Sequence, residues 1–157
     1  MNTKRKISIF LIAGLAAAGT AAAQDQEKKI KRSNLPAAVE KTVAAESAGA
    51  TIKGFSQEKE NGQIFYEAEM TVNGHTKDVL IDAKGAVVEV EEEIALDALS
   101  PEVKTGLLAK ADKGKITTVE TIKKRGKLVA YEAKVSTNGK KSEVQVGPNG
   151  KPLDREE

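Results

Sequence analysis

The sequence predicts an α+β fold of two tandem repeats, each a helix packed on a three- to four-stranded antiparallel sheet. The chain aligns with itself at an offset of 65, where residues 65–85 match residues 130–150 without a gap. Each copy follows a segment with a helical apolar stripe. Each also contains an Asn-Gly dipeptide between alternating segments, which is a strong hairpin signal. These three observations predict a duplicated unit of about 60 residues.

The N-terminal residues have the three parts of a secretory signal peptide. A basic cluster is followed by an apolar stretch and by a run of alanines that ends at Ala23. The apolar stretch is shorter than the roughly 20 residues that a membrane-spanning helix needs. We therefore expect cleavage after Ala23, export to the periplasm or the medium, and no membrane attachment of the mature chain.

The mature chain is nearly neutral and has no cysteine. Removing the three basic residues of residues 1–23 leaves 22 Lys and Arg against 23 Asp and Glu, so the formal net charge falls from +2 to −1. Nucleic acid is therefore not an expected partner. The lack of cysteine excludes disulfides, thiolate metal sites and a lipid anchor. Residues 24–34 are polar without periodicity, and we expect them to be a flexible lead-in.

Each repeat opens with a predicted helix. In the first repeat, Pro36 falls in the opening turn, and Val39 and Val43 lie one turn apart on one face. In the second repeat, Ser100 is a good N-cap, and Pro101 suits the first helical position. The first repeat, the connector and the second repeat span residues 35–93, 94–98 and 99–157.

Antiparallel strands are expected after each helix. The first, residues 51–59 and its counterpart 116–123, has an uncertain register, and a bulge is expected near a residue inserted in the second repeat. Two-residue turns at 73–74 and 138–139 then join two strands with apolar residues on one face. A four-residue loop at 82–85 adds a further strand in the first repeat. The expected pairs are Tyr66 with Ile81, Ala68 with Val79, Tyr131 with Val146, Ala133 with Val144, Ile81 with Ala86, and Val79 with Val88.

The order of these segments resembles a known family. The strings LPAAVEKTV and NGQIFYEAEMTVNGHTKDVLIDAKGAVVEVEEE, with the second copies SPEVKTGLL and KLVAYEAKVSTNGKKSEVQVGPNG, are similar to the PepSY-like domains of bacterial exported proteins, also described as similar to β-lactamase-inhibitor protein (BLIP). The resemblance covers residues 34–154. It implies a non-catalytic binding or regulatory module that in some relatives modulates or inhibits a peptidase or another envelope enzyme. The second copy lacks the aspartate of the Asp-x-x-Gly turn, so a function that depends on Asp82 is expected only in the first copy.

The sequence offers no recognisable active site. His75 is the only histidine, and we interpret it as a residue beside an exposed turn. A zinc centre with two histidines and a Ser-His-Asp triad are excluded, and glycine-rich phosphate loops are absent. We therefore expect no enzyme activity and no cofactor.

A row of carboxylates crosses the predicted outer face of the first repeat. The expected register places Glu69 opposite Asp78, and Asp78 opposite Glu89. Two interpretations stay open: the row binds a divalent cation or an envelope polymer, or it is a set of solvated charges on the wet side of the sheet. The corresponding row in the second repeat is Lys134, Glu143 and Asp154.

An unidentified protein of the periplasm or the exterior is the expected partner. Residues 35–93 carry a net charge of −7 and residues 99–157 a net charge of +5, so opposite charges favour docking of the two units or orient a polar partner. Few apolar anchors are available for a tight inhibitory interface. The residues expected at the partner surface are Phe65, Glu67, Glu69, Asp78, Leu80, Val87 and Glu89.

Overall fold

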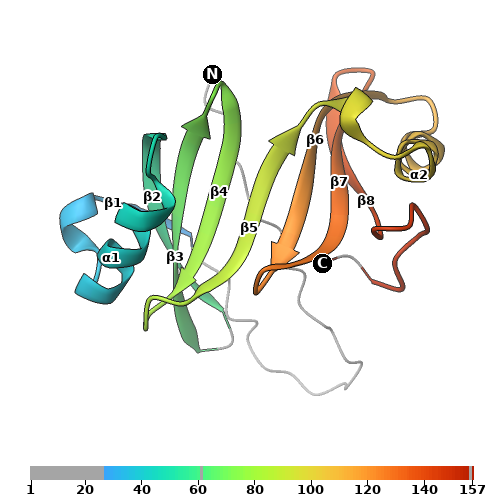
Figure 1. Ribbon diagram of the computed structural model, residues 1–157. Helices are drawn as coiled ribbons and strands as arrows, with labels where there is room; N and C mark the ends of the chain where they lie inside the picture. Colours follow the sequence, from blue (N-terminus) through green and yellow to red (C-terminus); the bar gives the residue numbers. More distant parts are fainter. Residues whose placement is uncertain (1–26, 61, 156) are drawn as a thin grey trace, which may run out of the picture.

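The computed structural model describes residues 27–60, 62–155 and 157, which form one eight-stranded antiparallel sheet with two helices (Figure 1). The strands follow one another across the sheet in chain order. They are β1 (Lys28–Ile30), β2 (Thr51–Glu60), β3 (Gln63–Val72), β4 (His75–Asp82), β5 (Val87–Ile94), β6 (Lys115–Lys124), β7 (Lys127–Thr137) and β8 (Lys140–Val146). The expected signal peptide and its cleavage position lie outside the described residues.

The helices α1 (Ala37–Glu46) and α2 (Pro101–Ala111) begin as the sequence predicts. Each is preceded by a short 3-10 turn, η1 (Arg32–Asn34) or η2 (Leu96–Ala98). The Val103 amide of α2 donates a hydrogen bond to Ser100 Oγ at 3.3 Å, which confirms the predicted N-cap. Neither helix is long and apolar enough to cross a membrane.

Both helices cover the same face of the sheet, here called the helix face, at its two ends (Figure 1). Each helix buries its predicted apolar stripe in a separate core. The first core contains Val39, Val43, Phe55, Tyr66, Ala68, Met70, Val79 and Ile81. The second contains Leu99, Val103, Leu107, Ala111, Val119, Ala133, Val135 and Val146. The apolar sides of the two predicted hairpins are thus the sides that the helices cover.

The two Asn-Gly hairpins have the predicted turns and registers. Asn73 and Gly74 have φ angles of 50° and 87°, as expected for the type I′ turn that this dipeptide favours. Tyr66 pairs with Ile81, and the second hairpin repeats this arrangement at residues 138–139. Strand alternation therefore places the same apolar positions on the helix face in both halves.

The expected pairing of β4 with β5 is wrong by one or two residues. The Asp82 amide donates to the Ala86 carbonyl, so Ala86 closes the turn and Ile81 pairs with Val87. A bulge between Leu80 and Ile81 then shifts the rest of the ladder. A bulge places two residues of one strand against one of its partner, and here Val88 is the extra residue.

Residues 28–34, expected to be part of a flexible lead-in, instead form β1 and η1. Lys29 of β1 pairs with Ser56 of β2, and Ile30 packs against the first core. A three-residue strand is too short to show a recognisable alternation of apolar and polar residues in the sequence. The strand is therefore identified only in the structure, where Ile30 packs against the first core.

The two expected sheets are continuous, because β5 pairs with β6. The bulge expected near the inserted residue lies at residues 122–123, where Val129 of β7 is left without a pairing partner. The strands β2 and β6 have further bulges, at residues 52–54 and 116–118, which the sequence did not lead us to expect. In the described part of the chain no strand follows β8, so Asp154 does not extend the predicted row of Lys134 and Glu143.

Candidate functional site

The face of the sheet opposite the helices carries carboxylates on most of its strands, and we call it the acidic face. Strand alternation directs them there because their neighbours in the chain point toward the helices. Its acidic residues are Glu58, Glu60, Glu67, Glu69, Asp78, Asp82, Glu89, Glu91, Glu93, Glu120, Glu132 and Glu143. The row therefore extends over both halves of the sheet rather than over the first alone.

The predicted carboxylate row is partly correct. Glu69 lies opposite Asp78, as expected. Asp78, however, lies opposite Glu91, and Glu89 lies opposite Leu80, because the β5 bulge shifts the register. Glu69, Asp78 and Glu89 therefore do not form one row across the strands.

Several of these carboxylates are buried, although the sequence favours solvated charges. Glu67, Asp78 and Glu89 are 5%, 2% and 6% exposed. Burial, opposed by the hydrogen bond from Ser56, raises the pKa of Glu67 to about 8. Burial and then the neighbouring Glu132 raise the pKa of Glu91 to about 10. Removing a carboxylate from water favours its neutral form.

The second half supplies donors to its carboxylates. Lys134 Nζ donates to Glu120 Oε2 at 2.5 Å, and Gln145 Nε2 donates to Glu132 Oε2 at 2.8 Å. Lys124 Nζ lies 3.7 Å from Glu89 Oε2 where the two halves join. In the first half, Ser56 Oγ donates to Glu67 Oε2 at 2.9 Å.

Glu67 Oε1 accepts no hydrogen bond from the described residues. It belongs to a group of three carboxylates, with Glu69 of β3 and with Glu27, which directly precedes β1. One ligand oxygen from each of the three lies within 4.8 Å of the other two. Sequence reasoning missed Glu27 because it lies in the segment expected to be flexible.

Part of the predicted partner surface lines a hollow of about 410 Å³ at one end of the acidic face, here called the Phe65 hollow. Phe65, Leu80 and Glu89, three of the residues expected at the partner surface, line it. Val87 does not, because the bulge turns it toward the first core and places Val88 in the hollow. The full lining is Glu60, Gln63, Phe65, Leu80, Asp82, Val88, Glu89, Lys124 and Arg125.

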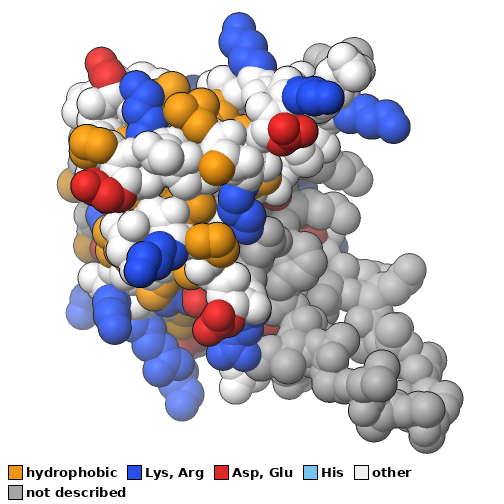
Figure 2. Space-filling model, turned by 90° about the vertical axis from the view of Figure 1, so that its right-hand side faces the viewer, with side chains coloured by type: hydrophobic (Ala, Val, Ile, Leu, Met, Phe, Trp, Pro, Cys, Tyr) orange, Lys and Arg blue, Asp and Glu red, His pale blue; other side chains and the backbone are white. Residues whose placement is uncertain are grey.

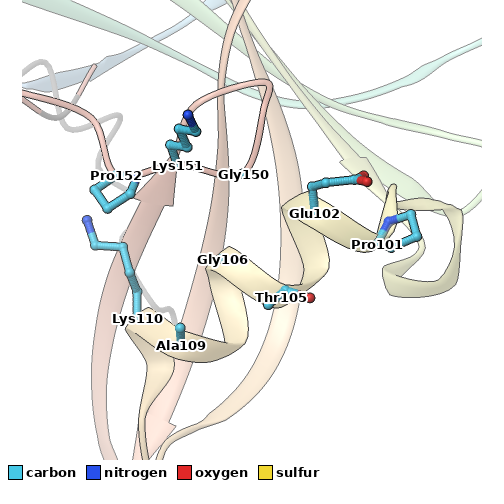
Figure 3. A pocket seen from close by; sticks show the side chains of 9 residues that line it. All are labelled: Pro101, Glu102, Thr105, Gly106, Ala109, Lys110, Gly150, Lys151 and Pro152. Atoms are coloured by element: carbon cyan, nitrogen blue, oxygen red, sulfur yellow. The ribbon is translucent and has the colours of Figure 1, made fainter.

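A second hollow, of about 550 Å³, lies between α2 and the loop after β8 (Figure 3). Apolar side-chain atoms and backbone atoms form most of its lining, and Lys110 and Lys151 lie at its border. Lysine and arginine side chains are spread over this end of the molecule between hydrophobic patches (Figure 2), as the net charge of residues 99–157 leads one to expect. No pattern in the sequence indicates this hollow, since it depends on a close approach of two backbone segments.

Solved structures of Bacteroides proteins are similar to this chain. A DUF2874 family protein of Bacteroides ovatus is 21% identical with a TM-score of 0.57, covering 76% of this chain and 84% of its own. A BLIP-like protein of Bacteroides fragilis is 21% identical with a TM-score of 0.54, covering 74% and 81%. A proposed periplasmic protein of Bacteroides eggerthii is 17% identical with a TM-score of 0.60, covering 75% and 85%.

The chain has a BLIP-like fold. At these identities the likeness extends to the fold alone. No family model matches the sequence, and no curated protein is similar to it.

Proposed function

We propose that the chain is a non-catalytic binding module that acts in the periplasm or outside the cell and recognises a protein of the cell envelope. The observation that carries this proposal is the Phe65 hollow, where apolar side chains lie between acidic and basic ones. Aromatic and arginine side chains carry much of the binding energy at protein interfaces. Phe65 and Arg125 supply one of each within a single concave surface.

The partner we propose is an envelope peptidase or another envelope enzyme whose activity the module modulates. The resemblance of the sequence to PepSY-like domains and the BLIP-like fold support this class of partner. Buried carboxylates and Lys124 beside the hollow favour a partner that presents charged groups of both signs around an apolar centre.

Export is part of the same proposal. The signal-like residues 1–23 favour cleavage after Ala23. The fold also occurs in a proposed periplasmic protein of Bacteroides eggerthii. Detection of a mature N-terminus at Gln24 by mass spectrometry of a periplasmic fraction would support it, and an intact N-terminus there would contradict it.

We further propose that residues 35–93 and 99–157 are PepSY-like copies of one ancestral unit. Matching hydrogen bonds close their last turns: Gly85 N to Asp82 O in one and Gly150 N to Gly147 O in the other. Each of these glycines also packs against a helix carbonyl, of Ala38 or of Glu102. The same contacts at equivalent positions of both halves favour an origin by duplication over a chance similarity of the two halves.

The partner hypothesis is tested by affinity capture from a periplasmic extract. We expect wild-type protein to retain a defined protein at least tenfold more strongly than the double variant Phe65→Ala, Arg125→Ala, because truncating interface anchors commonly costs more than 1 kcal/mol. The purified partner is then assayed for its own activity with and without the module.

Ile64→Ala is the matched control. Ile64 neighbours Phe65 in β3, is 39% exposed and points away from the hollow. Equal capture by wild type and by the double variant would contradict the assigned surface, and unchanged partner activity would contradict modulation.

A further inference from the structure

Three carboxylates meet near the β1 end of the acidic face. Glu67 and Glu69 extend from β3, and Glu27 directly precedes β1. One oxygen from each lies within 4.8 Å of the other two. Calcium binds oxygen at about 2.3–2.6 Å, so two ligands of one ion are separated by at most about 5 Å. The three oxygens are therefore close enough to bind the same calcium ion.

Glu67 provides a second and independent indication of a ligand. The residue is 5% exposed, and Ser56 donates to its Oε2 at 2.9 Å. Its Oε1 is buried and has no hydrogen-bond partner among the described residues. A buried carboxylate oxygen without a partner is costly, and a cation held by this group of acids removes that cost.

The second half of the sheet supports this interpretation by contrast. Glu132 takes the position that Glu67 has in the first half, since each is the second residue of a matching Tyr-Glu-Ala. Gln145 donates to Glu132, whereas its counterpart Leu80 offers Glu67 no donor. Lys134 stands where the first half has Glu69. At the positions of Gln145 and Lys134, which act as internal partners in the second half, the first half thus has Leu80, whose side chain has no donor, and an additional carboxylate, Glu69.

Among the described residues, one lysine forms an ion pair with one of the three acids. Lys29 Nζ is 4.0 Å from Glu69 Oε1, but the lysine side chain is 70% exposed. An exposed pair at this distance contributes little to stability. A single lysine also leaves most of the negative charge of three carboxylates uncompensated.

We propose that Glu27, Glu67 and Glu69 form a calcium site at the β1 end of the acidic face, with water completing the coordination. This site lies on different residues from the Phe65 hollow, so it does not depend on the proposed partner binding. Calcium fits better than magnesium, which requires shorter bonds and a stricter octahedral arrangement.

The test is calorimetric and thermal titration of the exported full chain, purified from the periplasm, with calcium chloride at pH 8. We expect a dissociation constant on the order of 10⁻⁴–10⁻³ M, as in extracellular calcium modules, and a rise in melting temperature of roughly 3–6 °C at saturating calcium. Glu67→Gln, which keeps the shape of the side chain, is expected to weaken binding at least tenfold. Glu69→Lys, which introduces the residue of the second half, is expected to abolish it.

Glu132→Gln is the control, and we expect it to bind calcium within twofold of wild type. Lys29→Gln should bind at least as well as wild type, because it removes a competing positive charge. The proposal is overturned if calcium produces no heat and no melting shift. It is equally overturned if Glu67→Gln responds as wild type does, or if sodium chloride of equal ionic strength produces the same shift.

Discussion

Glu132 is a buried carboxylate whose protonation is coupled to folding. It is 6% exposed, and burial, opposed by the hydrogen bond from Gln145, raises its pKa to about 7. Glu143, Lys134 and Glu120 are the charged groups that also act on it. Because its pKa is higher in the folded chain than in the unfolded one, the folded state binds more protons between these two values.

We therefore predict that the contribution of Glu132 to stability decreases as the pH rises from about 4.5 to about 7. Each unit of pKa difference corresponds to about 1.4 kcal/mol, so the full decrease is on the order of 3–4 kcal/mol. Glu132→Gln should flatten the pH dependence and be more stable than wild type at pH 8. Urea unfolding at pH 5, 6, 7 and 8 measures this, and parallel curves for the two proteins would contradict it.

The sequence predicts which side of each strand such residues occupy, but not their burial. The alternation around Glu67 and Glu69 places both on the acidic face, as in the structure. Burial depends on which groups surround that face in three dimensions. A strand in which apolar and charged residues alternate has the same sequence pattern whether its charged side is exposed to solvent or buried. Glu27 could not be identified for a similar reason, since its position depends on the short strand β1.

At the scale of elements, α2 approaches the loop after β8 so closely that one of its residues has to be glycine. A Cβ on Gly106 would overlap the carbonyl oxygen of Gly150, and Figure 3 shows these two backbones facing each other. In the first half the equivalent position is Thr42, whose hydroxyl donates to the Gly85 carbonyl at 2.6 Å. A hydrogen bond in one half is thus replaced by direct backbone contact in the other.

We predict that Gly106→Ala lowers the free energy of unfolding by about 2 kcal/mol. Alanine would stabilise an unconstrained helix by about 1 kcal/mol, but the overlap displaces α2 from the loop, and overpacking commonly costs more than this. Thermal and urea unfolding measure the change. Thr105→Ala, at an exposed position of the same helix, should stay within about 0.5 kcal/mol of wild type, and a stabilised Gly106→Ala would contradict the packing described.

The elements that the sequence predicts correctly have strong local signals. Ser100 and Pro101 identify the start of α2, and the two Asn-Gly turns determine their hairpin registers. The β4–β5 ladder has a weaker signal, because a turn of either four or five residues is compatible with the sequence at 82–86. The structure selects the arrangement with a bulge, in which the freed Val88 carbonyl accepts a hydrogen bond from the Arg125 amide.

Across the whole molecule, β5 connects two cores that are otherwise separate. Val90 of β5 packs against the first core, and Ile94 of the same strand packs against the second. Between the cores the helix face is polar, with Lys123 Nζ donating to Glu92 Oε2 at 2.6 Å. Loss of either core therefore removes support from the strand that both halves share.

We predict that Leu107→Ala destabilises the whole chain by about 2–5 kcal/mol, the usual cost of truncating a buried leucine. Leu107 is fully buried in the second core. Hydrogen exchange should increase in β3 and β4 as well as in β7, because unfolding is shared through β5. Leu108→Ala is the control, since its side chain is 49% exposed. Exchange that increases only in β6–β8 would show that the halves unfold independently.

The sequence repeat predicts two similar halves but not their union in one sheet. Each half contains its own helix, hairpin and apolar face, so the alignment describes the local units well. The pairing of β5 with β6 lies outside the repeated pattern, since it joins the last strand of the first half to the first strand of the second half. Only the structure shows that the two halves are joined by strand pairing within one sheet, rather than by packing of two separate domains against each other.

An open sheet of eight strands leaves two edges, and the residues on them limit self-assembly. Unpaired backbone groups at a sheet edge can recruit the edge of another molecule and begin fibre growth, and lysine is a common means of preventing it. β1 is three residues long and exposes Lys28 and Lys29, while β8 exposes Lys140 and Lys141. Edge-to-edge stacking of two copies would bring these positive charges together, so the chain should resist fibre formation even at high concentration.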